Sequence, residues 1–96
     1  SLQMKVFHVA ISSRDDLTND EIDKLFQIGN KDILINLAIN HNLTESNKNE
    51  IIKKGTYLAR KKLIHNHNLT DEQKELLLDM MKKHKNLYQD LINFLN

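Results

Sequence analysis

The chain has 96 residues, a formal net charge of +1, two glycines and neither cysteine nor proline. A chain of this length suits a single domain, and the absence of cysteine excludes disulfides, thiol catalysis and Cys-ligated metal or iron–sulfur sites. Few glycines and aromatic residues disfavour a turn-rich β-sandwich, and no apolar run approaches the length of about twenty residues that spans a membrane. We therefore expect one all-α domain over residues 1–96, without a membrane segment and located in the cytoplasm.

The net charge hides an uneven distribution along the chain. Residues 1–47 carry four basic and seven acidic side chains, a net charge of −3, whereas residues 48–96 carry ten and six, a net charge of +4. Such a division can attract an acidic partner, although it also arises by chance in small helical proteins. The abundance of Asn, Lys and Ile indicates an AT-rich genome, as in a low-GC bacterium or its phages and plasmids.

The first predicted element is a helix over Met4 to Ser12. Four apolar residues fall at helical spacings in this stretch: Val6, Phe7, Ala10 and Ile11. The run Val-Phe-His-Val-Ala-Ile also favours β structure locally, which leaves a short strand as the alternative. Residues 1–3 precede a plausible initiator Met4, and we expect them to be a cloning remnant.

The rest of the chain is built from a repeat of 26 residues. The sequence Asn-His-Asn-Leu-Thr occurs identically at residues 40–44 and 66–70, and its last three positions align with Asp16-Leu17-Thr18. Apolar positions recur with the same spacing, as in Leu25, Ile51 and Leu77. The repeats cover about residues 12–37, 38–63 and 64–89, followed by a C-terminal cap, and the helix before them corresponds to half a repeat.

Each repeat is predicted to begin its first helix at a threonine. Thr18, Thr44 and Thr70 are good N-caps, because a threonine hydroxyl accepts a hydrogen bond from a backbone N–H that the first turn leaves unpaired. Capping boxes are completed by Glu21 after the first threonine and by Gln73 after the third, whereas Thr44 is followed only by an asparagine. The first helices are therefore expected over residues 19–28, 45–54 and 71–83.

A second helix follows in each repeat after a short turn. Gly29 and Gly55 are expected to end the first two helices with left-handed caps, which cost glycine little. The second helices are expected over residues 31–40, 56–66 and 85–95. Helices of about ten residues bury too little alone and need neighbours, so the pattern predicts a short right-handed α-solenoid of about three helical-hairpin repeats with an N-terminal half-repeat helix.

The segment 37–78 contains Leu37-Ala38, Asn40, Asn42-Leu43-Thr44 and Leu58-Ala59-Arg60. With these residues it resembles the bacterial variant leucine-rich repeat family and its HEAT-like relatives, and weaker agreement covers roughly residues 4–90. The chain departs from that pattern in its repeat length, in the absence of prolines from the turns and in lacking a cysteine-rich cluster-binding segment, so a cluster cofactor is excluded. The resemblance implies a helical-repeat fold with a binding role, and it implies no particular activity.

The sequence offers no catalytic or metal-binding pattern. Its five histidines are interpreted as solvated turn residues: His8, His41, His65, His67 and His84. The two that occupy equivalent turns, His41 and His67, are expected about 10 Å apart, too far to share a zinc ion. We therefore expect no catalytic residues, metal or cofactor, and a non-enzymatic protein.

Asparagines cluster at the turns between repeats. Two of them begin matches to the glycosylation acceptor pattern, but the same residues serve the turn and the helix cap, and no secretory signal accompanies them. We expect these amides to bond turn backbone and to form a ladder between repeats: Asn40, Asn42, Asn66 and Asn68.

Basic residues form the one candidate site. Lysines recur near the turns inside the repeats, and a solenoid aligns such turns along one edge. The predicted site consists of Lys31, Lys53, Lys54, Arg60, Lys61, Lys62, Lys82, Lys83 and Lys85. Solvated lysines that favour helix C-termini, an acidic protein partner and a nucleic acid are the three explanations, with Tyr57 and Tyr88 as the exposed aromatic candidates.

The last helix is amphipathic, and Phe94 and Leu95 so near the end are expected to be partly uncovered. Self-association through either end of the solenoid, or docking onto a larger partner, would cover such residues. We expect a non-enzymatic protein-interaction module, adaptor-like or inhibitor-like, that holds a protein partner on one layer of helices. The alternative is a small nucleic-acid-binding module that uses the lysine-rich edge.

Overall fold

A computed structural model describes the backbone of residues 2–96 and the side chains from residue 4 onward. All regular structure within these residues is helical, which confirms the all-α prediction and the helix at the start of the chain. The helices are α1 (Leu2–Ser12), α2 (Asn19–Ile28), α3 (Lys31–Leu37), α4 (Glu45–Lys54), α5 (Tyr57–Asn66), α6 (Asp71–Lys82) and α7 (Lys85–Leu95). The expected cloning remnant, residues 1–3, falls on positions whose side chains lie outside the described residues.

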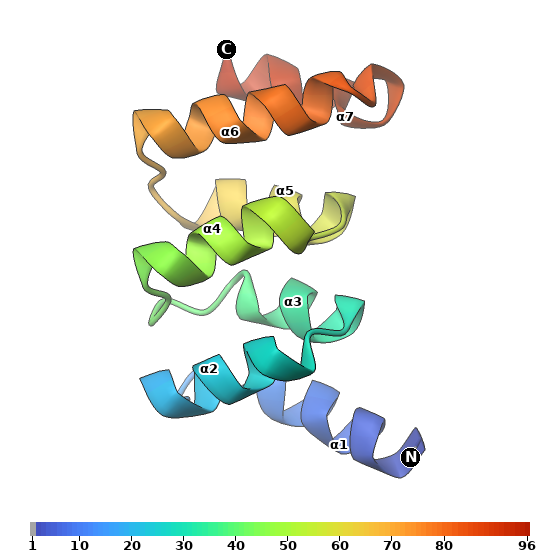
Figure 1. Cartoon of the computed structure of the whole chain (residues 1–96), viewed down its shortest axis with the longest axis vertical. Coiled ribbons are helices and arrows are strands. Elements are labelled where there is room, and N and C mark those ends of the chain that lie inside the picture. Colours follow the sequence, from blue (N-terminus) through green and yellow to red (C-terminus); the bar gives the residue numbers. More distant parts are fainter. Residues whose placement is uncertain (1) are drawn as a thin grey trace.

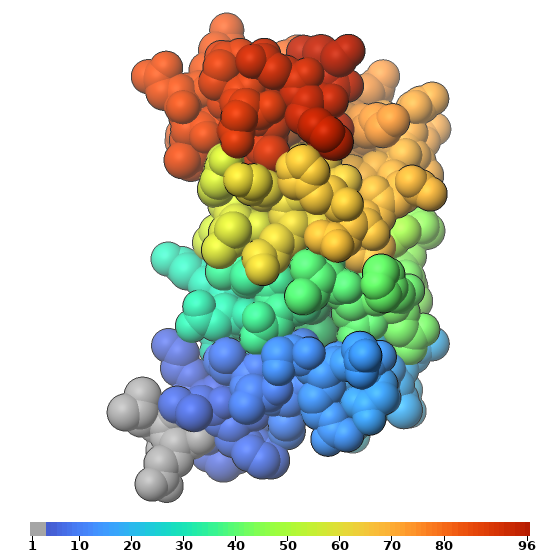
Figure 2. Space-filling model, turned by 180° about the vertical axis from the view of Figure 1, so that it is seen from behind, coloured from blue at the N-terminus to red at the C-terminus, as the bar shows by residue number. Residues whose placement is uncertain are grey.

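The helices lie in two layers along an elongated molecule of 39 × 25 × 17 Å (Figure 1). One layer contains α2, α4 and α6, and the other contains α1, α3, α5 and α7, in which each helix packs on the next. The layers meet through the contacts of α1 with α2, α2 with α3, α4 with α5 and α6 with α7. Seen from behind, successive parts of the chain therefore occupy successive bands along the long axis (Figure 2).

The core consists of two clusters that run between the layers. The smaller cluster joins α2 and α3 through Leu17, Ile22, Leu25, Ile33 and Leu37, and the larger one extends from α3 to α7. Phe26 and Leu43 pack against both clusters and connect them. Since most apolar contacts are made with the neighbouring helices in this row, each helix depends on the next one for its burial.

The three threonine caps are present as predicted. The side chains of Thr18, Thr44 and Thr70 each accept a hydrogen bond from the backbone N–H three residues on, within 3.1–3.2 Å. The expectation that only two of them form capping boxes is wrong, because Asn47 Oδ1 accepts from the backbone N–H of Thr44 at 3.1 Å. An asparagine side chain is thus long enough to close the box here.

Helix α3 ends at Leu37, three residues before the expected Asn40. The side chain of Asn40 accepts from the backbone N–H of Asn42 at 2.8 Å and donates to the carbonyl of Arg14 at 3.3 Å. These bonds turn the chain toward the preceding repeat instead of letting the helix continue. Local side-chain hydrogen bonds of this kind compete with helical ones, which is why asparagine favours turns.

The two glycines end their helices in different ways. Gly29 has φ 65° and forms the predicted left-handed cap, with its N–H donating to the carbonyl of Leu25. The same prediction for Gly55 is wrong, since its φ of −71° is open to any residue. Glycine is needed there for space, because an added Cβ would overlap the carbonyl oxygen of Ile51 and would approach Ala59 Cβ to 3.2 Å.

We therefore expect Gly55→Ala to lower the free energy of unfolding by about 2 kcal/mol, because the added methyl group overlaps the Ile51 carbonyl oxygen and crowds Ala59. Urea denaturation followed by circular dichroism measures the change. Ser46→Ala, at an exposed position of the same helix, is the control and should change stability by less than about 0.5 kcal/mol. Equal stability of the wild type and Gly55→Ala would contradict the lack of space for a side chain at this position.

Candidate functional site

Six exposed lysines gather at one edge of the molecule. The short turns that join α2 to α3, α4 to α5 and α6 to α7 all lie on the same side, at the right of Figure 1. We name the lysine edge by the exposed residues that these turns carry: Lys31, Lys53, Lys54, Lys82, Lys83 and Lys85. The opposite edge is acidic, because the first turns of α2, α4 and α6 carry Asp20, Glu21, Glu45, Asp71 and Glu72.

Helix dipoles account for only part of the lysine edge. Lys53, Lys54 and Lys82 lie in the last turns of their helices, where the partial negative charge of the helix end favours a cation. Lys31 and Lys85 are instead the first residues of α3 and α7, where the helix dipole disfavours a positive charge. Among the described residues, one edge lysine forms an ion pair: Lys54 Nζ lies 3.0 Å from Glu50 Oε2.

The arginine that the sequence assigned to this edge is buried in the core. Arg60 is 9% exposed, and its Nε donates to the carbonyl of Ile52 at 2.9 Å. Its Nη1 donates to the hydroxyl oxygen of Tyr88 at 2.7 Å, and its Nη2 donates to the carbonyl of Lys53 at 3.3 Å. Arg60 therefore caps the C-terminus of α4 and joins it to α7, and its prediction as a binding residue is wrong.

The neighbouring basic residues of α5 are less exposed than the lysines of the turns. Lys61 and Lys62 are half-buried, and Lys61 Nζ lies 5.9 Å from the centre of the Tyr57 ring. The charge of the edge is therefore carried by the six lysines of the turns. The six lysines lie at the turns where periodicity predicted them, and their binding role stays a prediction. Arg60 is turned inward by the orientation of α5, which periodicity alone did not resolve.

Neither tyrosine offers an open ring at the surface. Tyr88 is 3% exposed, so the expectation that it is an exposed aromatic is wrong. Tyr57 is half-buried beside it, with the two ring centres 5.5 Å apart, and its hydroxyl donates to Asp90 Oδ2 at 2.6 Å. This hydrogen bond raises the pKa of Tyr57 and lowers the pKa of Asp90.

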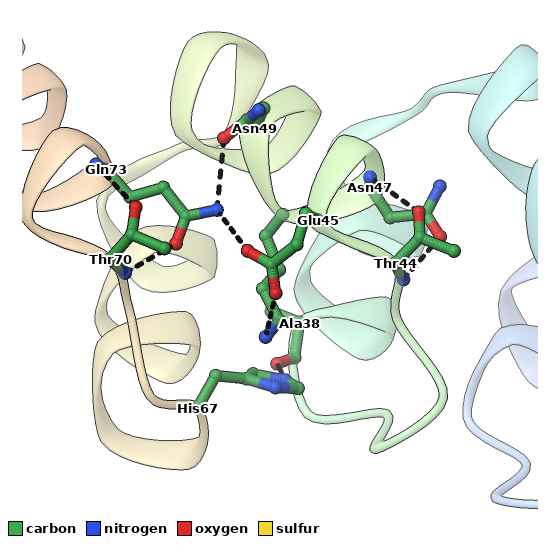
Figure 3. A network of polar contacts seen from close by, with 9 residues as sticks. Ala38, Thr44, Glu45, Asn47, Asn49, His67, Thr70 and Gln73 are labelled. Carbon is green, nitrogen blue, oxygen red and sulfur yellow. Dashed lines mark hydrogen bonds and ion pairs between the residues drawn. The ribbon is translucent and has the colours of Figure 1, made fainter.

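The capping amides have a second role that sequence analysis missed (Figure 3). While Gln73 closes the capping box of α6, its Nε2 donates to Glu45 Oε2 at 2.8 Å and to Asn49 Oδ1 at 3.2 Å, both in α4. One repeat earlier, Asn47 Nδ2 donates to Asp23 Oδ1 of α2 at 3.3 Å. The same position thus joins consecutive helices of the layer twice. The sequence signal for this role was the recurrence of a carboxyl or amide side chain three residues after each threonine.

Two shallow grooves lie beside these amides, between the helices of the same layer. The groove between α4 and α6 has a volume of about 330 Å³, and the one between α2 and α4 about 400 Å³. They are equivalent, since Gln27 and Ser46 of one groove correspond to Lys53 and Glu72 of the other by a shift of 26 residues. Lys53 and Lys54 line one groove each, so both grooves open toward the lysine edge.

At the acidic edge, turn asparagines connect repeats through the backbone. Asn40 Nδ2 donates to the carbonyl of Arg14, and Asn42 Nδ2 donates to the carbonyl of Leu17 at 3.2 Å, which confirms the predicted ladder for this pair. Asn66 instead donates to the carbonyl of Lys62 within its own helix, at 2.7 Å. In the third repeat, His67 makes the contact between repeats.

His67 lies closer to His41 than the expected 10 Å, with 6.3 Å between the ring centres. Its Nε2 lies 2.8 Å from the carbonyl oxygen of Ala38, and a carbonyl only accepts, so this nitrogen carries the proton. Burial lowers the pKa of His67, the hydrogen bond to Ala38 opposes that change, and the nearby Lys48 and His41 lower the pKa further. No group of three or more potential metal ligands occurs within the described part of the chain.

Comparison of the chain with protein-family models, with curated proteins and with solved structures finds no match. The resemblance to variant leucine-rich repeat proteins therefore stays a prediction. Over residues 2–96, no helix combines the length and the apolar character needed to cross a bilayer. Any function has to be argued from the geometry of the chain itself.

The lowered pKa of His67 predicts a dependence of stability on pH. As the pH falls below about 6.5, the ordinary histidine pKa, the unfolded chain binds a proton before the folded chain does. The free energy of unfolding should therefore fall with pH from about 6.5 until the folded-state pKa is reached. Urea denaturation at several pH values measures this slope, and His67→Gln should reduce it. An unchanged slope in His67→Gln would contradict the assignment.

The buried contact between Arg60 and Tyr88 predicts a loss of stability in Tyr88→Phe. The substitution leaves one guanidinium N–H without its acceptor in the core and should cost about 2 kcal/mol, as measured by urea denaturation. Tyr57→Phe is the matched control, because it removes an equally short hydroxyl bond to an exposed carboxylate and should cost clearly less. A larger loss of stability in Tyr57→Phe than in Tyr88→Phe would contradict the importance of the hydrogen bond between Arg60 and Tyr88.

Proposed function

We propose that this chain is a non-enzymatic protein-interaction module that acts in the cytoplasm and binds an acidic segment of a partner protein along the lysine edge. In this proposal the seven helices are a short right-handed α-solenoid of about three helical-hairpin repeats with a leading half-repeat. The recurrence of caps, buried positions and grooves every 26 residues supports it. A repeat array displays equivalent turns in a row, which suits binding along an edge.

The observation that carries the proposal is the position of Lys31 and Lys85. Both are exposed cations at the first residue of a helix, where the dipole of that helix disfavours them, and both lie among four further lysines of the same edge. A role in helix stability does not account for these two lysines. Attraction of an anionic partner does, because clustered charges of one sign raise the rate of encounter and orient the complex.

The chemistry of the edge favours carboxylates of a protein over a nucleic acid. Arginine is the residue that binds phosphates bidentately, and Arg60 is committed to the core. Single-stranded nucleic acid needs aromatic surfaces for stacking, and Tyr88 is buried while Tyr57 is half-buried. An extended segment of about ten residues, at about 3.3 Å each, matches the length of the molecule along which the turns are placed.

The test uses charge reversal at the two lysines that helix stability does not need. Lys31→Glu combined with Lys85→Glu should weaken binding of an oligoglutamate peptide by about tenfold or more at low salt, measured by isothermal titration calorimetry. The substitutions place acidic groups at helix N-termini, where they are favourable, so the variant should remain folded. The control is Lys5→Glu with Lys74→Glu, which changes the net charge equally at exposed positions outside the edge.

Binding of the peptide that is equally weakened by both double variants would contradict an edge-specific site. Duplex and single-stranded DNA are tested in parallel at two salt concentrations. Lysine-dependent DNA binding with a steep salt dependence, together with no peptide binding, would overturn the protein-partner proposal in favour of nucleic acid.

A further inference from the structure

The N-terminal end of the molecule exposes a concentration of large apolar side chains. Val6, Phe7 and Ile28 are 61%, 58% and 45% exposed. A hollow of about 230 Å³ between α1 and α2 is lined in part by Phe7, Ile11, Leu25 and Ile28. Both helices lie at the same end of the stack (Figure 1). Exposed apolar patches of this kind mark interaction surfaces.

Phe7 occupies a position that is buried in the next two helices of its layer and exposed, as Lys85, in α7. A shift of 26 residues leads from Phe7 to Ile33 and then to Ala59, and both of these are fully buried. Ile33 is covered by residues of α2, including Ile22. The side of α1 that carries Phe7 is therefore apolar like a buried helix face. Among the described residues, no helix covers it.

We propose that a second copy of this chain covers this face, with α1 and α2 of one copy packing on α1 and α2 of the other about a two-fold axis. The charges around the hollow support a second copy as the occupant. Glu21 and Lys24 of α2 both line it, and both are exposed. A two-fold axis that passes between Glu21 and Lys24 places Glu21 of each copy opposite Lys24 of the other, so the same patch can be complementary to itself.

The size of the end limits the strength of this contact. The two shorter dimensions of the molecule are 25 and 17 Å, so each copy buries on the order of 400 Å². The total of about 800 Å² is below the range of about 1,200–2,000 Å² that stable complexes bury. We therefore expect a reversible dimer that forms at high protein concentration and dissociates on dilution.

Sedimentation equilibrium over a range of concentrations tests the proposal. The mass of the wild type should rise from 11.3 kDa toward twice that value as concentration increases. Phe7→Glu should stay monomeric throughout, because a carboxylate cannot be buried unpaired in an apolar contact. Phe94→Glu is the matched control at the other end of the chain, where Phe94 is 59% exposed, and it should dimerise like the wild type.

The charged pair gives a second readout that is independent of the phenylalanine. Glu21→Gln keeps a side-chain oxygen to accept from the backbone N–H of Thr18, and Lys24→Gln retains a long polar side chain. Each should weaken dimerisation by about threefold at low salt. The double variant should be no weaker than the singles, because either substitution removes the same contacts between copies.

A wild type that stays monomeric at every concentration would overturn the proposal and would leave the face to another occupant. Loss of the dimer in Phe94→Glu, with the dimer retained in Phe7→Glu, would assign self-association to the C-terminal end instead. Circular dichroism of all variants, which are substituted at exposed positions, confirms that the monomers are folded.

Discussion

Every helix of this chain is too short to be stable alone, and this constraint governs the rest of the structure. The helices contain 7 to 12 residues, so each one gains its stability by covering its neighbours along the row. The caps make this possible, because a threonine at the start of α2, α4 and α6 satisfies backbone N–H groups and fixes where each helix begins. Gln73 and Asn47 then extend the same capping boxes into contacts between helices, so local and tertiary structure share the same side chains.

The burial of Arg60 illustrates how packing assigns a role that residue type does not. Its guanidinium lies against the last carbonyls of α4 and the hydroxyl of Tyr88, at the equivalent of a position where α3 has Leu34. The partial negative charge of a helix C-terminus and three hydrogen bonds compensate for the loss of water around the cation. The consequence for function is a surface edge made of lysines, which attract carboxylates as mobile point charges and do not form the planar bidentate contacts of arginine.

Alternation of helix direction separates the charges of the molecule. Acidic residues begin α2, α4 and α6 and basic residues end α4 and α6, so parallel stacking of these helices collects acids at one edge and lysines at the other. The division of charge between the two halves of the sequence is a separate pattern, because it runs along the stack and not across it. An edge that carries the lysines of three turns offers a partner a larger charged surface than one turn does. Two copies joined at their N-terminal ends would carry two such edges.

Local signals in the sequence determined the helices, their threonine caps and the 26-residue recurrence, because capping and apolar periodicity act within one or two turns of the chain. They also placed six lysines at equivalent turns. Tertiary structure alone decided that Arg60 and Tyr88 lie inside, and that Phe7 lies at an open end while Ile33 is buried. Each of these depends on which neighbour a helix faces, and that orientation follows from packing in three dimensions, which the spacing of residues along a short helix does not specify.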